Sequence, residues 1–168
     1  MEESLRYFGN YRGKVLSNSD SSQRGRIKAE VYPMLVGTDT ALRLSRGGQR
    51  VTGISVNDLP WAIPATPLLE GAGAGTGAIG IPSVGDMVWL FFEEGDPNQP
   101  VYFAGAPDGV RGIPSSAATN YPERRVIETS SGALIIVDNS NGKIIITGAD
   151  DVVIQGTNVR INPLIPHT

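Results

Sequence analysis

The chain has 168 residues, of which 40% are hydrophobic, enough for one ordinary domain or for a small domain with an extension. Its 21 glycines and 12 prolines favour short strands and turns over helices. A net charge of −3 without a long basic run argues against a nucleic-acid-binding protein, and the lack of cysteine excludes disulfides and thiolate metal sites. No apolar run approaches the ~18 residues of a membrane span, and we expect no signal peptide.

The first third of the chain predicts an arm followed by two strands. Residues 1–10 carry a few apolar side chains among polar ones and predict a short arm or helix. The segments YRGKVLSN and RIKAEVYP flank a polar turn, and the second alternates Ile27, Ala29 and Val31 with charged residues. This period of two is typical of a half-buried strand. Residues 37–58 are less regular and predict a long loop with some strand.

The middle of the chain contains the clearest hairpin. LPWAIPA, residues 59–65, places apolar side chains between prolines, which predicts an edge strand because proline cannot donate to a ladder. After a glycine-rich loop, VGDMVWLFFEEGDPNQPVYFAG has two aromatic, β-branched runs around a set of turn residues. Residues 11–106 therefore predict five short strands, which fit a small barrel of the OB type.

The motif GTGAIG, residues 75–80, has the GxGxxG spacing of dinucleotide-binding loops. Nucleotide binding needs a strand before the motif and a helix after it, so that the pyrophosphate meets a helix N-terminus. Here prolines precede the motif and a strand follows it. We therefore interpret these glycines as a flexible connection into the hairpin and expect no nucleotide cofactor.

A short repeat appears after a linker at residues 107–122. Ile-Thr-Gly at 146–148 recurs as Ile-Gln-Gly at 154–156, and short rungs of this kind indicate a β-helical stack. Strand alternation places apolar side chains on one side of a layer that is too small to enclose a core alone. Burial against the same stripe of two further chains would give a closed threefold prism. The predicted trimer core consists of Ile144, Ile146, Val152, Ile154, Val159 and Ile161.

The order of these pieces resembles the OB-fold domain of central spike proteins, which occur in contractile phage tails and type VI secretion systems. The resemblance covers about residues 11–106 and is most specific from Gly80-Ile81-Pro82 to Gly85-Asp86 and through the hairpin that follows. The repeats at 126–162 resemble the triple-stranded β-helix of the same family. We therefore expect an all-β chain with an N-terminal arm (1–10), an OB-fold domain (11–106), a linker (107–122) and a β-helix with its tip (123–168).

The resemblance implies a structural component of the virion and not an enzyme. Spike proteins of this family are homotrimers in the tail baseplate, and their OB domains attach to a tail hub protein. Sheath contraction drives the spike through the outer membrane of the host. Some members carry a lysozyme between the two domains, but the linker at 107–122 is too short for one. We expect a central spike that is made in the host cytoplasm and has no catalytic residues.

The C-terminal end departs from the family pattern. Several members end in a His-x-His pair that holds an iron ion on the threefold axis, whereas this chain has the single histidine His167. Three chains could supply three imidazoles to a metal ion, and a frayed terminal histidine is the alternative. We expect no other cofactor. The apolar residues Ile161, Leu164 and Ile165 predict a blunt end that receives a separate tip protein.

Two groups of residues carry other possible chemistry. The acidic groups at 93–96 and 150–151 fall at predicted turns, so we interpret them as solvated and not as catalytic pairs. Aromatic residues of an OB fold can stack on bases, but alternation should turn half of them inward. The aromatic candidates are Trp61, Trp89, Phe91, Phe92, Tyr102 and Phe103. The alternative function is an OB-fold module that binds single-stranded nucleic acid and carries a trimerising tail.

Overall fold

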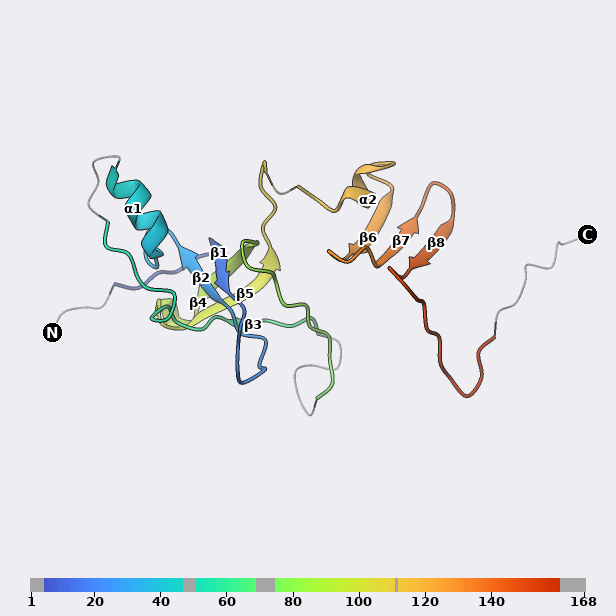
Figure 1. Cartoon of the computed structure of the whole chain (residues 1–168), viewed down its shortest axis with the longest axis horizontal. Coiled ribbons are helices and arrows are strands. Elements are labelled where there is room, and N and C mark those ends of the chain that lie inside the picture. The colour runs from blue at the N-terminus through green and yellow to red at the C-terminus, as the bar shows by residue number, and fades with distance from the viewer. Residues whose placement is uncertain (1–4, 47–50, 69–74, 111, 161–168) are drawn as a thin grey trace, which may run out of the picture. The chain divides into compact units, whose positions relative to one another are not determined.

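The computed structural model describes residues 5–46, 51–68, 75–110 and 112–160 of the chain (Figure 1). The chain divides into two compact units, Met1–Val110 and Arg111–Thr168. Each unit has its own sheet, with five strands in the first and three in the second.

The first unit is built on one mixed sheet with the strand order β2-β1-β4-β5-β3. Strand β1 pairs antiparallel with β2 and with β4, β4 pairs antiparallel with β5, and β3 runs parallel to β5. The strands are β1 (Tyr11–Ser17), β2 (Lys28–Val31), β3 (Ile63–Pro64), β4 (Met87–Phe92) and β5 (Pro100–Gly105). The five predicted strands are confirmed, with the proline-flanked segment at the edge.

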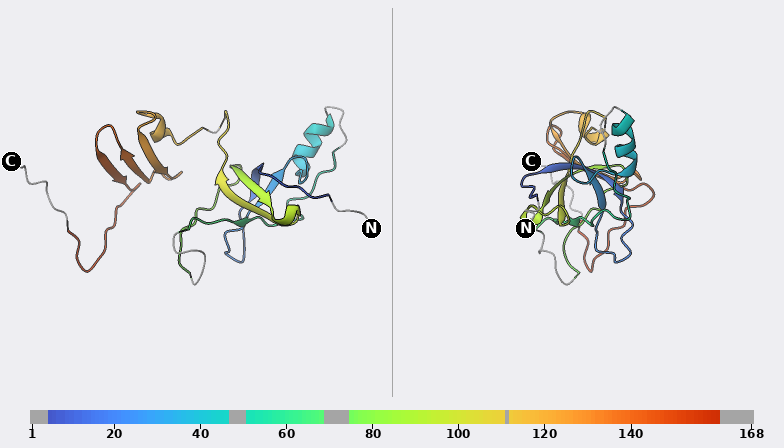
Figure 2. Two further views of the ribbon diagram at one scale, coloured as in Figure 1. Left: turned by 180° about the vertical axis from the view of Figure 1, so that it is seen from behind. Right: turned by 90° about the vertical axis from the view of Figure 1, so that its left-hand side faces the viewer.

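The two edges of this sheet curl round until they meet. Ile27, just before β2, exchanges two backbone hydrogen bonds with Ala62, just before β3, at 3.0 and 2.8 Å. Because β2 and β3 are the outermost strands, this bridge joins one edge of the sheet to the other. The curl is visible in the strands of the first unit in Figures 1 and 2. A mostly β, curled half-barrel agrees with the predicted all-β OB fold.

The core lies inside the curl and follows from the period-two pattern of the strands. In β4, Val88, Leu90 and Phe92 are buried, whereas the residues between them are half-buried on the outer face. The core also contains Tyr102, whose hydroxyl donates a hydrogen bond to the carbonyl oxygen of Gly25 at 2.6 Å. The other buried members are Val15, Ile27, Ala29, Val31, Leu35, Leu59 and Ala62.

A helix occupies part of the segment that predicted an irregular loop. Helix α1 (Thr38–Arg46) corrects the expectation for residues 37–58. The backbone N–H of Ala41 donates to the carbonyl of Gly37 at 2.9 Å, and the Ala41 side chain is buried. Alanine, leucine and arginine are good helix formers, and Asp39 lies in the positive first turn. The local sequence is compatible with a helix, but its apolar pattern is too short to predict one.

The hairpin between β4 and β5 turns through the short 3-10 helix η1 (Glu93–Gly95). The carboxylate of Asp96 accepts hydrogen bonds from the backbone N–H and the side chain of Asn98 and from the side chain of Gln99. These bonds lower the pKa of Asp96, with the backbone N–H of Asn98 as the largest cause. The acidic residues at 93–96 therefore lie at a turn, as predicted, and residues 5–10 form an arm without helix.

The second unit is a three-stranded antiparallel meander preceded by a short helix. Its elements are α2 (Ser115–Ala118), β6 (Arg124–Glu128), β7 (Leu134–Asp138) and β8 (Lys143–Thr147), in the sheet order β6-β7-β8. Residues 148–160 are described without strand. Within residues 112–160 the predicted repeat region contains an antiparallel sheet, and the C-terminal β-helix stays a prediction.

Within the described part of the chain, none of the helices has both the length and the apolar character needed to cross a bilayer.

Candidate functional site

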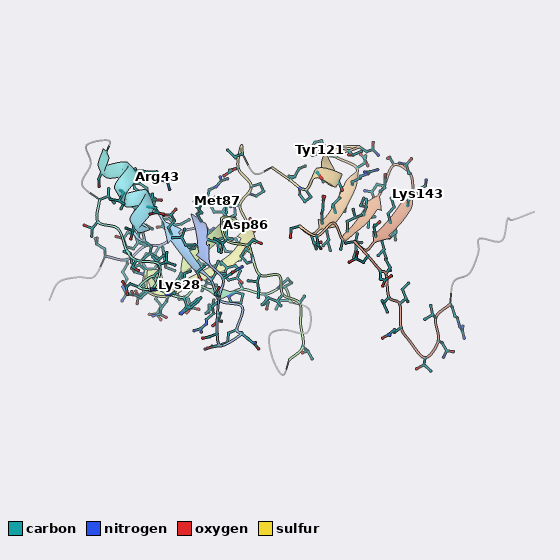
Figure 3. The ribbon with its side chains drawn as sticks, in the orientation of Figure 1. Lys28, Arg43, Asp86, Met87, Tyr121 and Lys143 are labelled. Atoms are coloured by element: carbon teal, nitrogen blue, oxygen red, sulfur yellow. The ribbon has the colours of Figure 1, made fainter. Side chains whose placement is uncertain are left out.

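One face of the three-stranded sheet is apolar and uncovered. The strand register places Ile127, Ile135 and Ile146 side by side, and Arg125, Val137 and Ile144 in the next row. Their apolar side chains range in exposure from 38% at Val137 to 72% at Ile144. Contiguous apolar surface of this kind marks an interaction site in soluble proteins. We call these six residues the meander face; Figure 3 shows side chains leaving both faces of the sheet.

The opposite face of the same sheet is partly covered by α2. The carboxylate of Glu128 accepts hydrogen bonds from the hydroxyl of Ser115 at 3.0 Å and from the backbone N–H of Ser116 at 3.1 Å. These bonds, led by the one from the Ser116 N–H, lower the pKa of Glu128. The helix is therefore tied to β6, and Ile136 in the central strand is buried on the same face of the sheet. The sheet has one covered face and one bare face.

A buried carboxylate holds the strand ends in place. Asp138 is 2% exposed and forms an ion pair with Arg124, with 3.1 Å between Nε and Oδ2. It also accepts hydrogen bonds from Ser140, from the backbone N–H and side-chain amide of Asn141, and from Asn120 of the linker. The Asn141 amide is the largest cause that holds the pKa of Asp138 well below its usual range, and burial acts in the opposite direction. Asp138 thus joins β6, β7, the β7–β8 turn and the linker.

The predicted trimer-core residues divide into two groups. Ile144 and Ile146 both lie on the meander face, so the structure brings them together with three apolar residues from β6 and β7. Val152, Ile154 and Val159 are exposed and lie outside any strand. Ile161 lies outside the described residues, as do Leu164, Ile165 and His167, which the sequence assigned to tip docking and metal binding.

The structure gives less support to the other candidate sites, which are a metal site, an acidic pair and a nucleotide-binding loop. Among residues 5–46, 51–68, 75–110 and 112–160, no group of three or more His, Asp or Glu side chains could hold a metal ion. Asp150 and Asp151 are exposed, in agreement with their predicted place in a turn. No helix follows GTGAIG in the described segment from Gly75 to β4, so the motif lacks the helix N-terminus that a pyrophosphate needs. This finding agrees with the connecting role that we predicted.

The aromatic residues of the first unit divide as their alternation predicts. Phe92 and Tyr102 are buried in the core. Trp89, Phe91 and Phe103 lie on the outside, with the Phe91 and Phe103 rings 6.2 Å apart and the guanidinium of Arg12 5.0 Å from the Trp89 ring. Trp61 is not part of this group. Its ring centroid lies 5.1 Å from the guanidinium carbon of Arg26 and 4.9 Å from Nζ of Lys28.

One segment of the chain matches a known protein family. It contains the glycine-flanked helix α1, the edge strand β3 and the β4–β5 hairpin. Residues 37–106 match the family described as the Type VI secretion system/phage-baseplate injector OB domain. The matched residues, fewer than half of the chain, are similar to an OB domain of this family. The match confirms the resemblance that the hairpin and its lead-in suggested. Strands β1 and β2 precede the matched residues and belong to the same sheet as β4 and β5. No curated protein sequence matches the chain.

The injector OB domain belongs to a structural family of baseplates and not to an enzyme family. The sequence reading identified part of the meander face but missed Ile127, Ile135 and Val137. The period-two alternation in RRVIE and ALIIVD indicates strands with one apolar face. The trimer core was predicted only from the short repeat, which begins later in the chain.

Proposed function

We propose that this protein is the homotrimeric central spike of a contractile tail baseplate, a virion component that pierces the outer membrane of the host cell. Its action is mechanical, because an interlocked trimer can transmit the force of sheath contraction without unfolding. The injector OB domain supports the coarse role of a spike-type structural protein. The trimer, the puncturing step and the attachment to a hub are the finer parts of the proposal.

The meander face is the observation that carries the proposal. It presents five large aliphatic side chains to solvent in a single chain, next to β8, whose outer edge has no partner among the described residues. Two further copies would bury this face, and residues 148–160 of each copy would gain strand partners from the other chains. In a trimer with closed threefold symmetry, the meander face of every copy would be buried in the same way.

The remaining partners follow from the two ends of the chain. The OB domain would attach the spike to a tail hub protein, in line with the baseplate family to which it belongs. At the other end, Ile161, Leu164 and Ile165 would receive a separate tip protein. His167 could hold a tip metal ion such as iron, with one imidazole from each chain.

The direct test is the mass of the protein in solution. Light scattering should give three times the chain mass of 17.8 kDa. Ile146→Asp places a charge on the meander face, where the side chain of a single chain is exposed, so it should leave the chain folded but convert the trimer to monomer. The matched control is Thr147→Asp, one residue on and on the opposite face, which should stay trimeric. A wild-type monomer at micromolar concentration would remove the proposal.

One observation favours the alternative function, which is binding of single-stranded nucleic acid by the OB fold. Trp89, Phe91 and Phe103 with Arg12 form an outward aromatic surface with a cation, which suits base stacking. The chain is acidic overall, which disfavours binding to a phosphate backbone. Salt-dependent binding of a single-stranded oligonucleotide that Trp89→Ala abolishes would favour this alternative over the spike.

A further inference from the structure

The turn between β7 and β8 contains the dipeptide Asn141-Gly142, and Asn141 is the only asparagine of the sequence that a glycine follows. Both strands are labelled in Figure 1, and Lys143, labelled in Figure 3, begins β8 directly after the turn. Asn141 is exposed, and a Cβ at Gly142 would have open space around it. The peptide bond between the two residues therefore lies at the surface, and no side chain covers its nitrogen.

An asparagine that precedes glycine can lose its side-chain amide without an enzyme. The backbone nitrogen of Gly142 attacks Cγ of Asn141, so that an N–Cγ bond forms and the Cγ–Nδ2 bond breaks. The proton of the attacking N–H leaves with the amide group as ammonia. Water then opens the resulting succinimide at either carbonyl and gives aspartate or isoaspartate at position 141. Within residues 112–160, the N–H of Gly142 donates no hydrogen bond, so its nitrogen is available for the attack.

The amide that this reaction removes belongs to the hydrogen-bond network of the buried Asp138. Nδ2 of Asn141 donates to Oδ2 of Asp138 at 3.1 Å, and the backbone N–H of Asn141 donates to Oδ1 at 3.2 Å. The side-chain bond fixes the orientation of the amide, and a fixed amide reaches the Gly142 nitrogen less often than one that rotates freely. Deamidation replaces this donor by a second carboxylate beside a buried one, and two like charges in contact destabilise each other.

We infer that Asn141 is a site of spontaneous deamidation, that its bond to Asp138 slows the reaction, and that the product weakens the β7–β8 turn. The isoaspartate product adds a second disturbance, because it inserts an extra carbon into the backbone next to Gly142, whose φ of +58° belongs to the left-handed region. The reaction needs only a single chain. The inference therefore does not rest on the proposed trimer.

Peptide mapping of the full-length protein tests the site. After incubation of the folded protein in mildly alkaline buffer, trypsin releases residues 126–143 as one peptide, which contains both Asn139 and Asn141. Fragmentation in a mass spectrometer then assigns the loss of an amide to one of the two. Asn141 should convert several-fold faster than Asn139 and should yield both aspartate and isoaspartate. Equal rates at the two residues would overturn the site.

Gly142→Ala separates the chemistry of the dipeptide from the stability of the turn. The added Cβ hinders the attacking nitrogen and should slow the conversion of Asn141 several-fold. Strain at the φ of +58° would loosen the turn and act in the opposite direction, so a slower reaction reports the hindered nitrogen. An unchanged or faster conversion in this variant would contradict attack by the Gly142 nitrogen.

The restraint by Asp138 is tested with a matched pair of variants. Asp138→Ala removes the acceptor of the Asn141 amide and should speed the conversion several-fold. The control is Glu128→Ala, which removes a hydrogen-bonded carboxylate at the other end of the β6–β7 pair and should change the rate little. Equal acceleration in both variants would show that general loosening of the sheet, and not the bond to Asp138, sets the rate.

The consequence for the turn is tested with a variant that reproduces one product. Asn141→Asp should lower the urea midpoint of the second unit at neutral pH, because the added carboxylate faces the ionised Asp138. The control Asn158→Asp makes the same change at an exposed residue outside the sheet and should keep the wild-type midpoint. Equal midpoints in the two variants would overturn the proposed weakening of the turn.

Discussion

At the scale of single residues, Asp138 has the most connected side chain of the second unit. Its carboxylate joins two strands, a turn and the linker through Arg124, Asn141 and Asn120. Hydrogen bonds to an ionised group are stronger than neutral ones, which accounts for the lowered pKa of Asp138. A side chain of this kind sets the geometry of the meander face without belonging to it.

The linkage between this pKa and stability gives a pH prediction. Because the pKa of Asp138 is lower in the folded chain than in the unfolded chain, its contribution to stability is present above the unfolded value near 4 and is lost as the pH falls through the folded value. Asp138→Asn should lower the urea midpoint of the second unit at pH 7 and weaken its decline as the pH falls from about 5 toward 2. Asp151→Asn, which removes an exposed carboxylate, is the control and should change neither. An unchanged pH dependence in the Asp138 variant would contradict this prediction.

At the scale of elements, α1 shows how a helix is seated by its surroundings. Thr38 donates a hydrogen bond from its hydroxyl to the carbonyl of Ile54 at 3.2 Å, and Gly53 passes close beneath the start of the helix. A Cβ at Gly53 would lie 2.6 Å from the Thr38 Cα and 2.9 Å from the Ala41 Cβ. The first of these neighbours is backbone, which cannot move without displacing the helix.

Gly53→Ala should therefore destabilise the first unit, by about 1–3 kcal/mol as typical overpacking does. Gly80→Ala is the matched control, since a Cβ there has open space around it, and it should stay within about 0.5 kcal/mol of the wild type. Chemical denaturation followed by tryptophan fluorescence measures both variants. Equal stability of the two would show that α1 is not held at this point.

The elements also show where sequence reasoning succeeds and where it stops. The strands around Ile27 and Leu90 were predictable because alternation places their side chains in one core. Helix α1 was not predicted from the sequence. A short amphipathic segment of this kind becomes a helix only when packing against the rest of the unit buries a side chain such as Ala41. The meander was predicted as part of a repeat, but its bare face needed the strand register, which sequence spacing does not fix. Residues such as Val152 have no strand partners within one chain, so their role stays a prediction.

At the scale of the whole molecule, the chain divides into two compact units with separate sheets. Folding of such a chain is not expected to be a single two-state transition. The first unit contains its own buried cluster around Leu90, whereas most of the large apolar side chains in the described part of the second unit are exposed. The stability of the first unit should therefore depend on its core residues, and that of the second unit on protein concentration.

Calorimetry of the full chain should resolve two transitions. Leu90→Ala removes a fully buried side chain and should lower only the transition of the first unit, by about 2–5 kcal/mol. In the proposed trimer, association would stabilise the second unit, so its transition should rise with protein concentration. Ile146→Asp should remove that concentration dependence while leaving the first transition in place. A single transition that both variants shift equally would contradict the independence of the units.

The outer edge of β8 has a consequence for the life of a newly made chain. This edge and the neighbouring aliphatic face are an open template for further strands, and nothing in the described part of the chain blocks them with proline or a bulge. If the proposed trimer forms at this edge, a chain that has not yet met its copies can also pair there with other proteins. The yield of trimer should then depend on how quickly the chains meet after synthesis.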